Sequence, residues 1–191
     1  MDTQEKFGLK KSNAILLFVQ MIILILSTII SCFVFGFILA KDYGGLMLAS
    51  SLTMVIAHVA IIVYGAVGYN REKGYYYAAL GFFAFAVVIN VMANFRTPFQ
   101  LGLLTMLFGC LIAFLTKQDN KKLAMYFIMT ATLFSLVFSI YSAVIADPHS
   151  LGDENVGTLT IIAMYASLFS PTFLSGTFTL IHFVHMDKEK E

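Results

Sequence analysis

Residues 13–40 read NAILLFVQMIILILSTIISCFVFGFILA, a run without Asp, Glu, Lys or Arg. A helix needs about 20 such residues to cross the hydrocarbon core of a bilayer. The apolar segment of a cleaved signal peptide has only about 7–15. The run is therefore long enough to be a retained transmembrane helix, and it indicates that lipid rather than water surrounds the chain.

The composition of the whole chain agrees with this interpretation. Of the 191 residues 59% are hydrophobic and 12% are charged, and the mean hydropathy is +0.85. Soluble domains carry about 25% charged residues, so this chain has too little polar surface to cover a globule in water. Its two cysteines, Cys32 and Cys110, lie far apart inside apolar runs, which predicts neither a disulfide framework nor a zinc site.

Five further runs resemble the first in their length and lack of charge. A β-barrel would instead show alternating segments of about 10 residues, which this sequence lacks. We therefore expect an all-α polytopic membrane protein, with one transmembrane domain over 1–191 and six helices in an antiparallel bundle. The expected spans cover residues 13–40, 44–69, 75–95, 98–116, 123–146 and 157–185.

Lysine and arginine are distributed unequally between the two sides of this topology. Two of the twelve, Lys41 and Arg96, lie on one side, and the other ten lie on the side of both termini. Cytoplasmic loops carry an excess of Lys and Arg, so we expect a cell-membrane protein with both termini in the cytoplasm. The ten are Lys6, Lys10, Lys11, Arg71, Lys73, Lys117, Lys121, Lys122, Lys188 and Lys190.

No charged residue lies inside the six expected spans. This excludes a retinal Schiff base, which needs a lysine, and disfavours a proton pump built on carboxylates. The sequence also lacks a P-loop, a GxSxG elbow, a HExxH motif and a GxGxxG turn. We therefore expect no cofactor, no metal site and no nucleic-acid partner, and an enzyme is the least favoured class of function.

Two expected helices carry polar stripes at helical spacing. Pro171 removes one backbone donor, so a carbonyl of its helix needs a hydroxyl, water or a ligand as partner. Transporters commonly bind solute where a helix is broken near the midplane. Alternatively, the hydroxyls bond to their own helix or to a neighbour and leave no space. The stripes are Thr132, Ser135, Ser139 and Ser142 in one helix, and Ser167, Pro171, Ser175, Thr179 and His182 in the next.

His58 is the strongest single polar residue, because it lies near the middle of the expected span 44–69. Histidine is costly in hydrocarbon unless it faces protein or water. It could contact a ligand, sense protons or bind a metal, or it could hydrogen-bond to another helix. Gln20 and Asn90 add neutral hydrogen-bonding groups to two other spans.

Two further patterns concern packing. Small residues recur every four positions in the fourth span and predict a close helix–helix contact inside the bundle. Three consecutive tyrosines predict an aromatic belt at the cytoplasmic end of the third span. The residues are Thr105, Gly109 and Ala113 in the first pattern, and Tyr75, Tyr76 and Tyr77 in the second.

The sequence supports two functions from different classes. The predicted function is transport or binding of a small neutral or zwitterionic solute in a polar intramembrane cavity. The alternative is a non-catalytic subunit or scaffold that packs against a partner membrane subunit in the lipid bilayer. A polar cavity that reaches His58 and Pro171 would favour solute binding, and a dry core with an apolar outer groove would favour a subunit. The expected ligand-binding residues are His58, Ser135, Ser139, Ser167, Pro171 and Ser175.

In its size, helix number and orientation the chain is similar to the substrate-binding components of energy-coupling-factor vitamin transporters. The resemblance covers the whole chain and rests on no motif. The small-residue pattern that this family carries in its first helix is missing. The resemblance implies a six-helix fold and a membrane solute-binding role.

Single cysteines at positions 73 and 153, in a background without Cys32 and Cys110, test the orientation. An impermeant thiol reagent added to intact cells should label position 153 and spare position 73, because Lys73 is expected inside and Asp153 outside. Opening the cells should then make position 73 reactive. Labelling of position 73 but not 153 in intact cells would contradict the topology.

Overall fold

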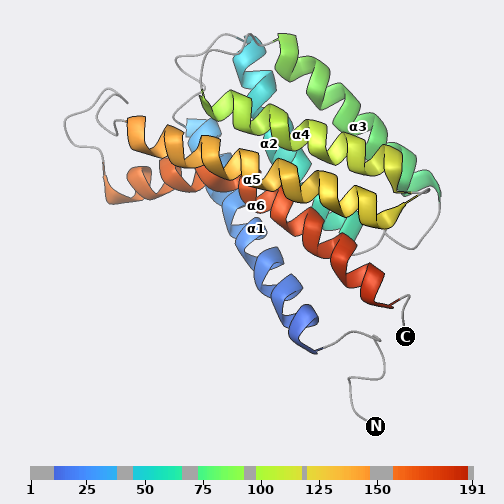
Figure 1. The fold of residues 1–191 in the computed structure, drawn as a ribbon. Coiled ribbons are helices and arrows are strands. Elements are labelled where there is room, and N and C mark those ends of the chain that lie inside the picture. Colours follow the sequence, from blue (N-terminus) through green and yellow to red (C-terminus); the bar gives the residue numbers. More distant parts are fainter. Residues whose placement is uncertain are drawn as a thin grey trace.

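The computed structural model describes residues 11–37, 45–65, 73–92, 98–117, 120–146 and 157–188. These ranges contain six α-helices, and the expected all-helical fold is confirmed for them (Figure 1). The helices are α1 (Lys11–Phe37), α2 (Gly45–Val63), α3 (Lys73–Met92), α4 (Pro98–Thr116), α5 (Lys121–Ile145) and α6 (Thr158–Lys188). The expected span ends at 38–40, 66–69 and 93–95, and the loop that contains Asp153, lie outside the described residues.

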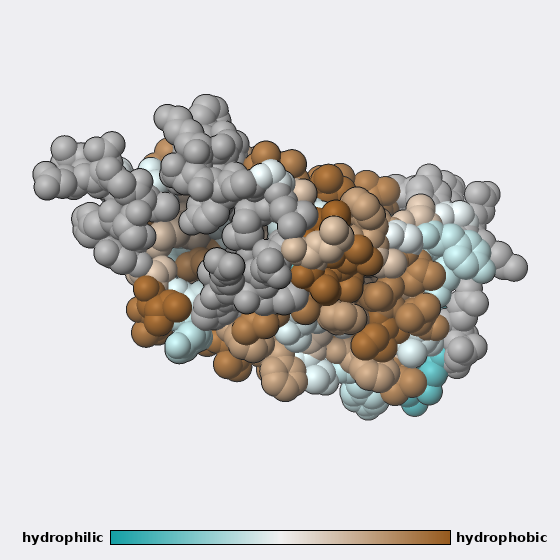
Figure 2. Space-filling model, turned by 90° about the horizontal axis from the view of Figure 1, so that it is seen from above, coloured by the Kyte–Doolittle hydropathy of each residue, from teal (hydrophilic) through white to brown (hydrophobic). Residues whose placement is uncertain are grey.

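Three of the described helices are long and apolar enough to cross a membrane. They contribute the segments Ser12–Cys32 of α1, Lys121–Ile145 of α5 and Thr158–Asp187 of α6. The apolar segments of α2, α3 and α4 are shorter, namely Leu48–Val63, Tyr76–Met92 and Leu101–Thr116. Apolar residues also cover much of the outer surface, as Figure 2 shows for one face. Length, composition and surface together support transmembrane helices.

Hydrogen bonds between helices show which helix ends lie together. Asn13 Nδ2 donates to Asp187 Oδ2, which joins the start of α1 to the end of α6. Lys117, directly after α4, donates from Nζ to the hydroxyl of Tyr64 at the end of α2, over 2.5 Å. Because Tyr64 also packs on Phe178 of α6, with ring centroids 5.7 Å apart, these contacts lie toward the same end of the bundle. We call it the lysine end.

Among the described glycines, Gly109 lies at the closest approach of two helices, which is that of α4 and α5. A Cβ atom built on Gly109 of α4 would lie 2.1 Å from the Cβ of Ala131 on α5. The internal contact predicted from the small-residue pattern is therefore confirmed at Gly109. Asn120 begins α5 as its N-cap, with its side chain accepting from the Leu123 N–H at 3.1 Å. The helices α4, α5 and α6 lie side by side, and α1 crosses α6 (Figure 1).

The tyrosine belt predicted in α3 is wrong for Tyr76. Its side chain is only 9% exposed, and its hydroxyl donates to the carbonyl of Phe114 in α4. Tyr77 is 56% exposed and remains compatible with a belt, and the side chain of Tyr75 lies outside the described residues. Tyr76 turns inward because a carbonyl at the end of α4 offers its hydroxyl a partner inside the protein.

Candidate functional site

The polar stripe of α5 lies against α6. Ser135 and Ser139 are buried, and each hydroxyl oxygen lies 3.3 Å from the hydroxyl oxygen of Thr172 on α6. Farther along, Thr132 Oγ1 lies 3.5 Å from Thr179 Oγ1. We call this row the α5–α6 hydroxyl seam. Thr172 is its centre, although the sequence analysis did not select it.

Most hydroxyls of the seam also bond back to their own helix. Ser135 donates to the Thr132 carbonyl at 3.1 Å, and Thr179 donates to the Ser175 carbonyl at 3.0 Å. Ser175 is fully buried, and its hydroxyl lies 3.0 Å from the Pro171 carbonyl oxygen. These groups therefore have partners within the protein without a solute. The predicted binding roles of Ser135, Ser139 and Ser175 stay predictions.

Pro171 lies inside α6, and the helix continues through it without a break. Its missing N–H would have bonded to the carbonyl four residues earlier, which belongs to Ser167. The hydroxyl of Ser170 donates to that carbonyl at 2.7 Å. The Ser167 carbonyl, which Pro171 leaves without its backbone donor, thus accepts a hydrogen bond from the residue next to the proline. The serine directly before the proline was the sequence feature that could have predicted this bond.

Ser170 also connects α6 with the turn of α2 that carries His58. Its hydroxyl oxygen lies 3.0 Å from the sulfur of Met54. The carbonyl of Met54 lies 2.6 Å from Nδ1 of His58, so Nδ1 carries the proton and donates. His58 Nε2 is then a buried lone pair, with no hydrogen-bond partner among the described residues.

A third face of α6 receives Gln20 from α1. The side-chain nitrogen of Gln20 donates to the Phe173 carbonyl at 3.2 Å. A Cβ atom on Gly176 would lie 3.2 Å from that nitrogen, so the glycine leaves space for the amide. Gly176 is therefore part of a packing contact between α1 and α6.

Groups of α6 that lie beside its predicted stripe thus face three neighbouring helices. Ser170 faces α2, Thr172 faces α5, and the backbone at Phe173 faces α1. The structure joins Ser135 and Ser139 through Thr172, and it brings the Ser167–Pro171 turn near the turn of His58. Across the described helices, no hydrogen bond joins His58 to the α5–α6 hydroxyl seam.

A separate polar network joins α2 and α3 at the end opposite the lysines. Ser50 donates to Asn90 Oδ1 at 2.5 Å, and Asn90 Nδ2 lies 3.0 Å from Thr53 Oγ1. The same nitrogen bonds to the Ala86 carbonyl at 2.8 Å, and Thr53 donates to the Ser50 carbonyl at 2.6 Å. All three side chains are buried and bonded, which makes the network a packing element.

The outer surface between α2 and α3 is hollowed by an apolar groove of about 320 Å³. Three of its eight lining residues are alanines, and the one polar atom among these side chains is the hydroxyl of Tyr64. The lining residues are Ile56, Val59, Ala60, Val63, Tyr64, Ala78, Ala79 and Phe82. We call it the α2–α3 groove. Sequence reasoning missed it, because it depends on how two helices sit together.

Within the ranges that the structure describes, no three His, Cys, Asp or Glu side chains are placed to hold a metal ion. Comparison with protein families, with curated proteins and with solved structures finds no match to this chain.

The role of Ser170 can be tested with Ser170→Ala. This change should lower the free energy of unfolding by about 1–3 kcal/mol, because it leaves the buried Ser167 carbonyl without a donor. The matched control is Ser142→Ala, which removes a buried hydroxyl that has no hydrogen-bond partner in the described part of the chain. Thermal unfolding in detergent compares the two.

Pro171→Ala should rescue Ser170→Ala, since it restores a backbone N–H that can reach the same carbonyl. Equal melting temperatures for Ser170→Ala and Ser142→Ala, or no rescue, would show that Ser170 does not serve the proline.

Proposed function

We propose that the protein is a non-catalytic subunit of a larger membrane complex, and that the α2–α3 groove receives an apolar transmembrane helix of a different membrane protein. The chain crosses the cell membrane six times with both termini in the cytoplasm. The groove carries the proposal. Small side chains at a helix surface let another helix backbone approach closely, and three of the groove's eight lining residues are alanines.

The polar groups inside the bundle support the same proposal. Most of those along the α5–α6 hydroxyl seam and around Pro171 are bonded to their own helix or to a neighbour. A solute would have to displace these contacts before it gained its own. The hydrogen bonds between helices at both ends of the bundle agree with six spans, since they join helix ends as an alternating topology requires.

Solute binding is the second candidate function. It is supported by His58, whose Nε2 lone pair is buried with no partner among the described residues. Buried polar atoms usually have a hydrogen-bond partner, and a small neutral or zwitterionic donor would supply one. The turns of Ser167 and Pro171 lie beside it through Met54 and Ser170.

A photo-crosslinking residue at Ala78 tests the subunit proposal in native membranes. Ala78 is exposed and lines the groove, so a docked helix would lie within reach. The expected product joins this chain to one other membrane protein, identified by mass spectrometry. The same residue at Thr130, exposed on α5, should give no such product.

Ala60→Leu should lower the yield from Ala78, because it fills the groove, whereas Thr130→Leu should not. Lipid adducts alone, or a product that joins two copies of this chain, would contradict the proposal.

Thermal unfolding of the purified protein with a small-molecule extract of the cells tests the second candidate. A ligand that binds the folded state raises the melting temperature. The extract should stabilise the wild type but not His58→Leu, which removes the acceptor, and Ser142→Ala should respond as the wild type does. No stabilisation, or equal stabilisation of His58→Leu, would exclude a solute at His58.

A further inference from the structure

One end of the α2–α3 groove is formed by Tyr64, where the helical geometry of α2 changes. The hydrogen-bond pattern widens to a π turn at Tyr64 and Gly65. Such turns are rare and often occur at functional sites. A Cβ atom on Gly65 would lie 2.4 Å from Cδ1 of Ile181, so α2 approaches α6 closely here. The end of the groove at Tyr64 is thus formed by a π turn that packs closely against α6.

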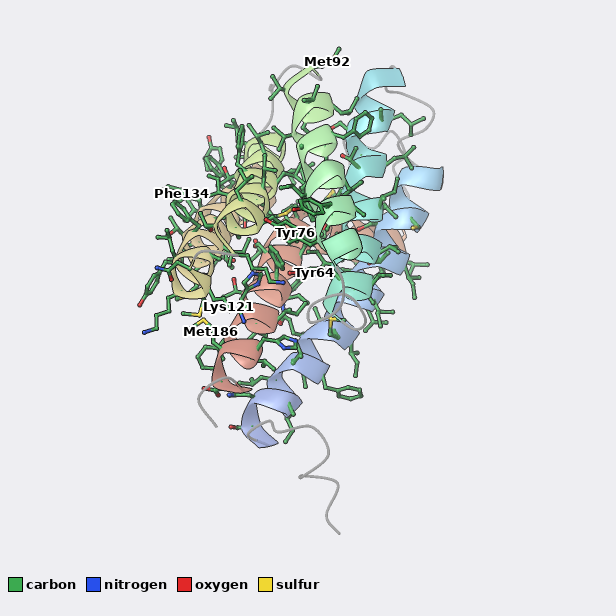
Figure 3. All side chains as sticks on the ribbon, turned by 90° about the vertical axis from the view of Figure 1, so that its right-hand side faces the viewer. Tyr64, Tyr76, Met92, Lys121, Phe134 and Met186 are labelled. Atoms are coloured by element: carbon green, nitrogen blue, oxygen red, sulfur yellow. The ribbon has the colours of Figure 1, made fainter. Side chains whose placement is uncertain are left out.

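The Tyr64 side chain is turned into the protein and is only 2% exposed. Its ring meets Phe114 and Phe178 edge to face, with centroids 5.0 Å and 5.7 Å away. Figure 3 looks toward this end of the bundle and labels Tyr64 and Tyr76 there. The inward position of this ring leaves the groove open beside it.

Lys117 engages both tyrosines from the end of α4. Its Nζ donates to the Tyr64 hydroxyl at 2.5 Å and lies 4.9 Å from the centroid of that ring. The same atom lies 5.9 Å from the centroid of Tyr76. A cation over an aromatic face is attracted to it, and more strongly where water is partly excluded. One ammonium therefore links the ends of α2, α3 and α4.

We propose that Lys117 is a positioning residue for the α2–α3 groove: its charge holds Tyr64 inward and so keeps the docking surface open. This inference rests on the proposed function only where it treats the groove as a docking surface; the effect of Lys117 on the shape of the groove does not depend on it. Tyrosine favours the membrane interface, where its hydroxyl meets water. Without the ammonium, Tyr64 turns outward into the groove and fills the space that a partner helix would occupy.

A tryptophan reporter measures the groove without any partner, because the chain contains no tryptophan of its own. Phe82→Trp places the reporter in the groove wall, and Phe134→Trp places a control on the exposed face of α5. The purified proteins are compared in nanodiscs of phosphatidylcholine with brominated acyl chains, which quench tryptophan on contact.

Lys117→Met should reduce quenching of the groove reporter and leave the α5 reporter unchanged. Loss of the charge should shift the ratio of inward to outward Tyr64 roughly five- to thirty-fold. Lys117→Arg keeps the charge and the donors and should keep the wild-type quenching. Lys122→Met removes an exposed lysine of the same end and serves as the matched control.

Unchanged quenching in Lys117→Met, or an equal loss in Lys117→Arg, would overturn the role of the charge. In native membranes Lys117→Met should also lower the crosslinking yield at Ala78. If quenching falls as expected but no variant crosslinks a partner, the proposed function fails and the role of Lys117 in shaping the groove stands.

Discussion

Hydrocarbon offers no hydrogen bonds, so each polar group inside a membrane bundle must find its partner within the protein. The proline of α6 shows this constraint most directly. Pro171 frees the carbonyl of Ser167, and the hydroxyl of Ser170 takes the place of the missing N–H. The helix therefore passes the proline without a break, and no ligand is needed to complete it.

The same constraint explains the distribution of polar residues over the faces of α6. Thr172 bridges two serines of α5, while the backbone at Phe173 receives the amide of Gln20 from α1. Each contact joins a different pair of helices. Polar groups act here as interhelical contacts of modest strength, about 0.6 kcal/mol on average in membrane proteins. Among the described residues, His58 Nε2 and the hydroxyls of Ser31 and Ser142 are buried without a hydrogen-bond partner, and the histidine keeps the solute hypothesis testable.

The all-helical fold could be predicted because charge-free runs are local features of the sequence. The run 157–185, for example, corresponds to α6 at Thr158–Lys188. The site was harder, since the direction of a side chain around its helix depends on three neighbours at once. Pro171 was identified from its missing donor, but Thr172 was not, because a threonine one position away from a polar stripe looks unremarkable in sequence. The burial of Tyr76 was not predicted either, because its hydrogen-bond partner, the Phe114 carbonyl, belongs to a different helix.

The interior of the bundle bears on solute binding, and the groove on its outer surface bears on the subunit proposal. The α5–α6 hydroxyl seam is filled by its own contacts, whereas the α2–α3 groove is apolar and open beside an inward tyrosine. Both features depend on side chains at helix ends and interfaces. A partner helix in the groove would bury apolar surface and pack against small residues, which is the interaction that the outside of this bundle offers.

Amide hydrogen exchange of the protein in lipid nanodiscs tests the closed interior most directly. We expect the amides of residues 172–179 in α6 to exchange as slowly as those around Leu107 in the buried face of α4. Fast exchange of residues 172–179, while the α4 amides stay protected, would reveal water between α5 and α6. That result would contradict a closed interior and favour a solute cavity.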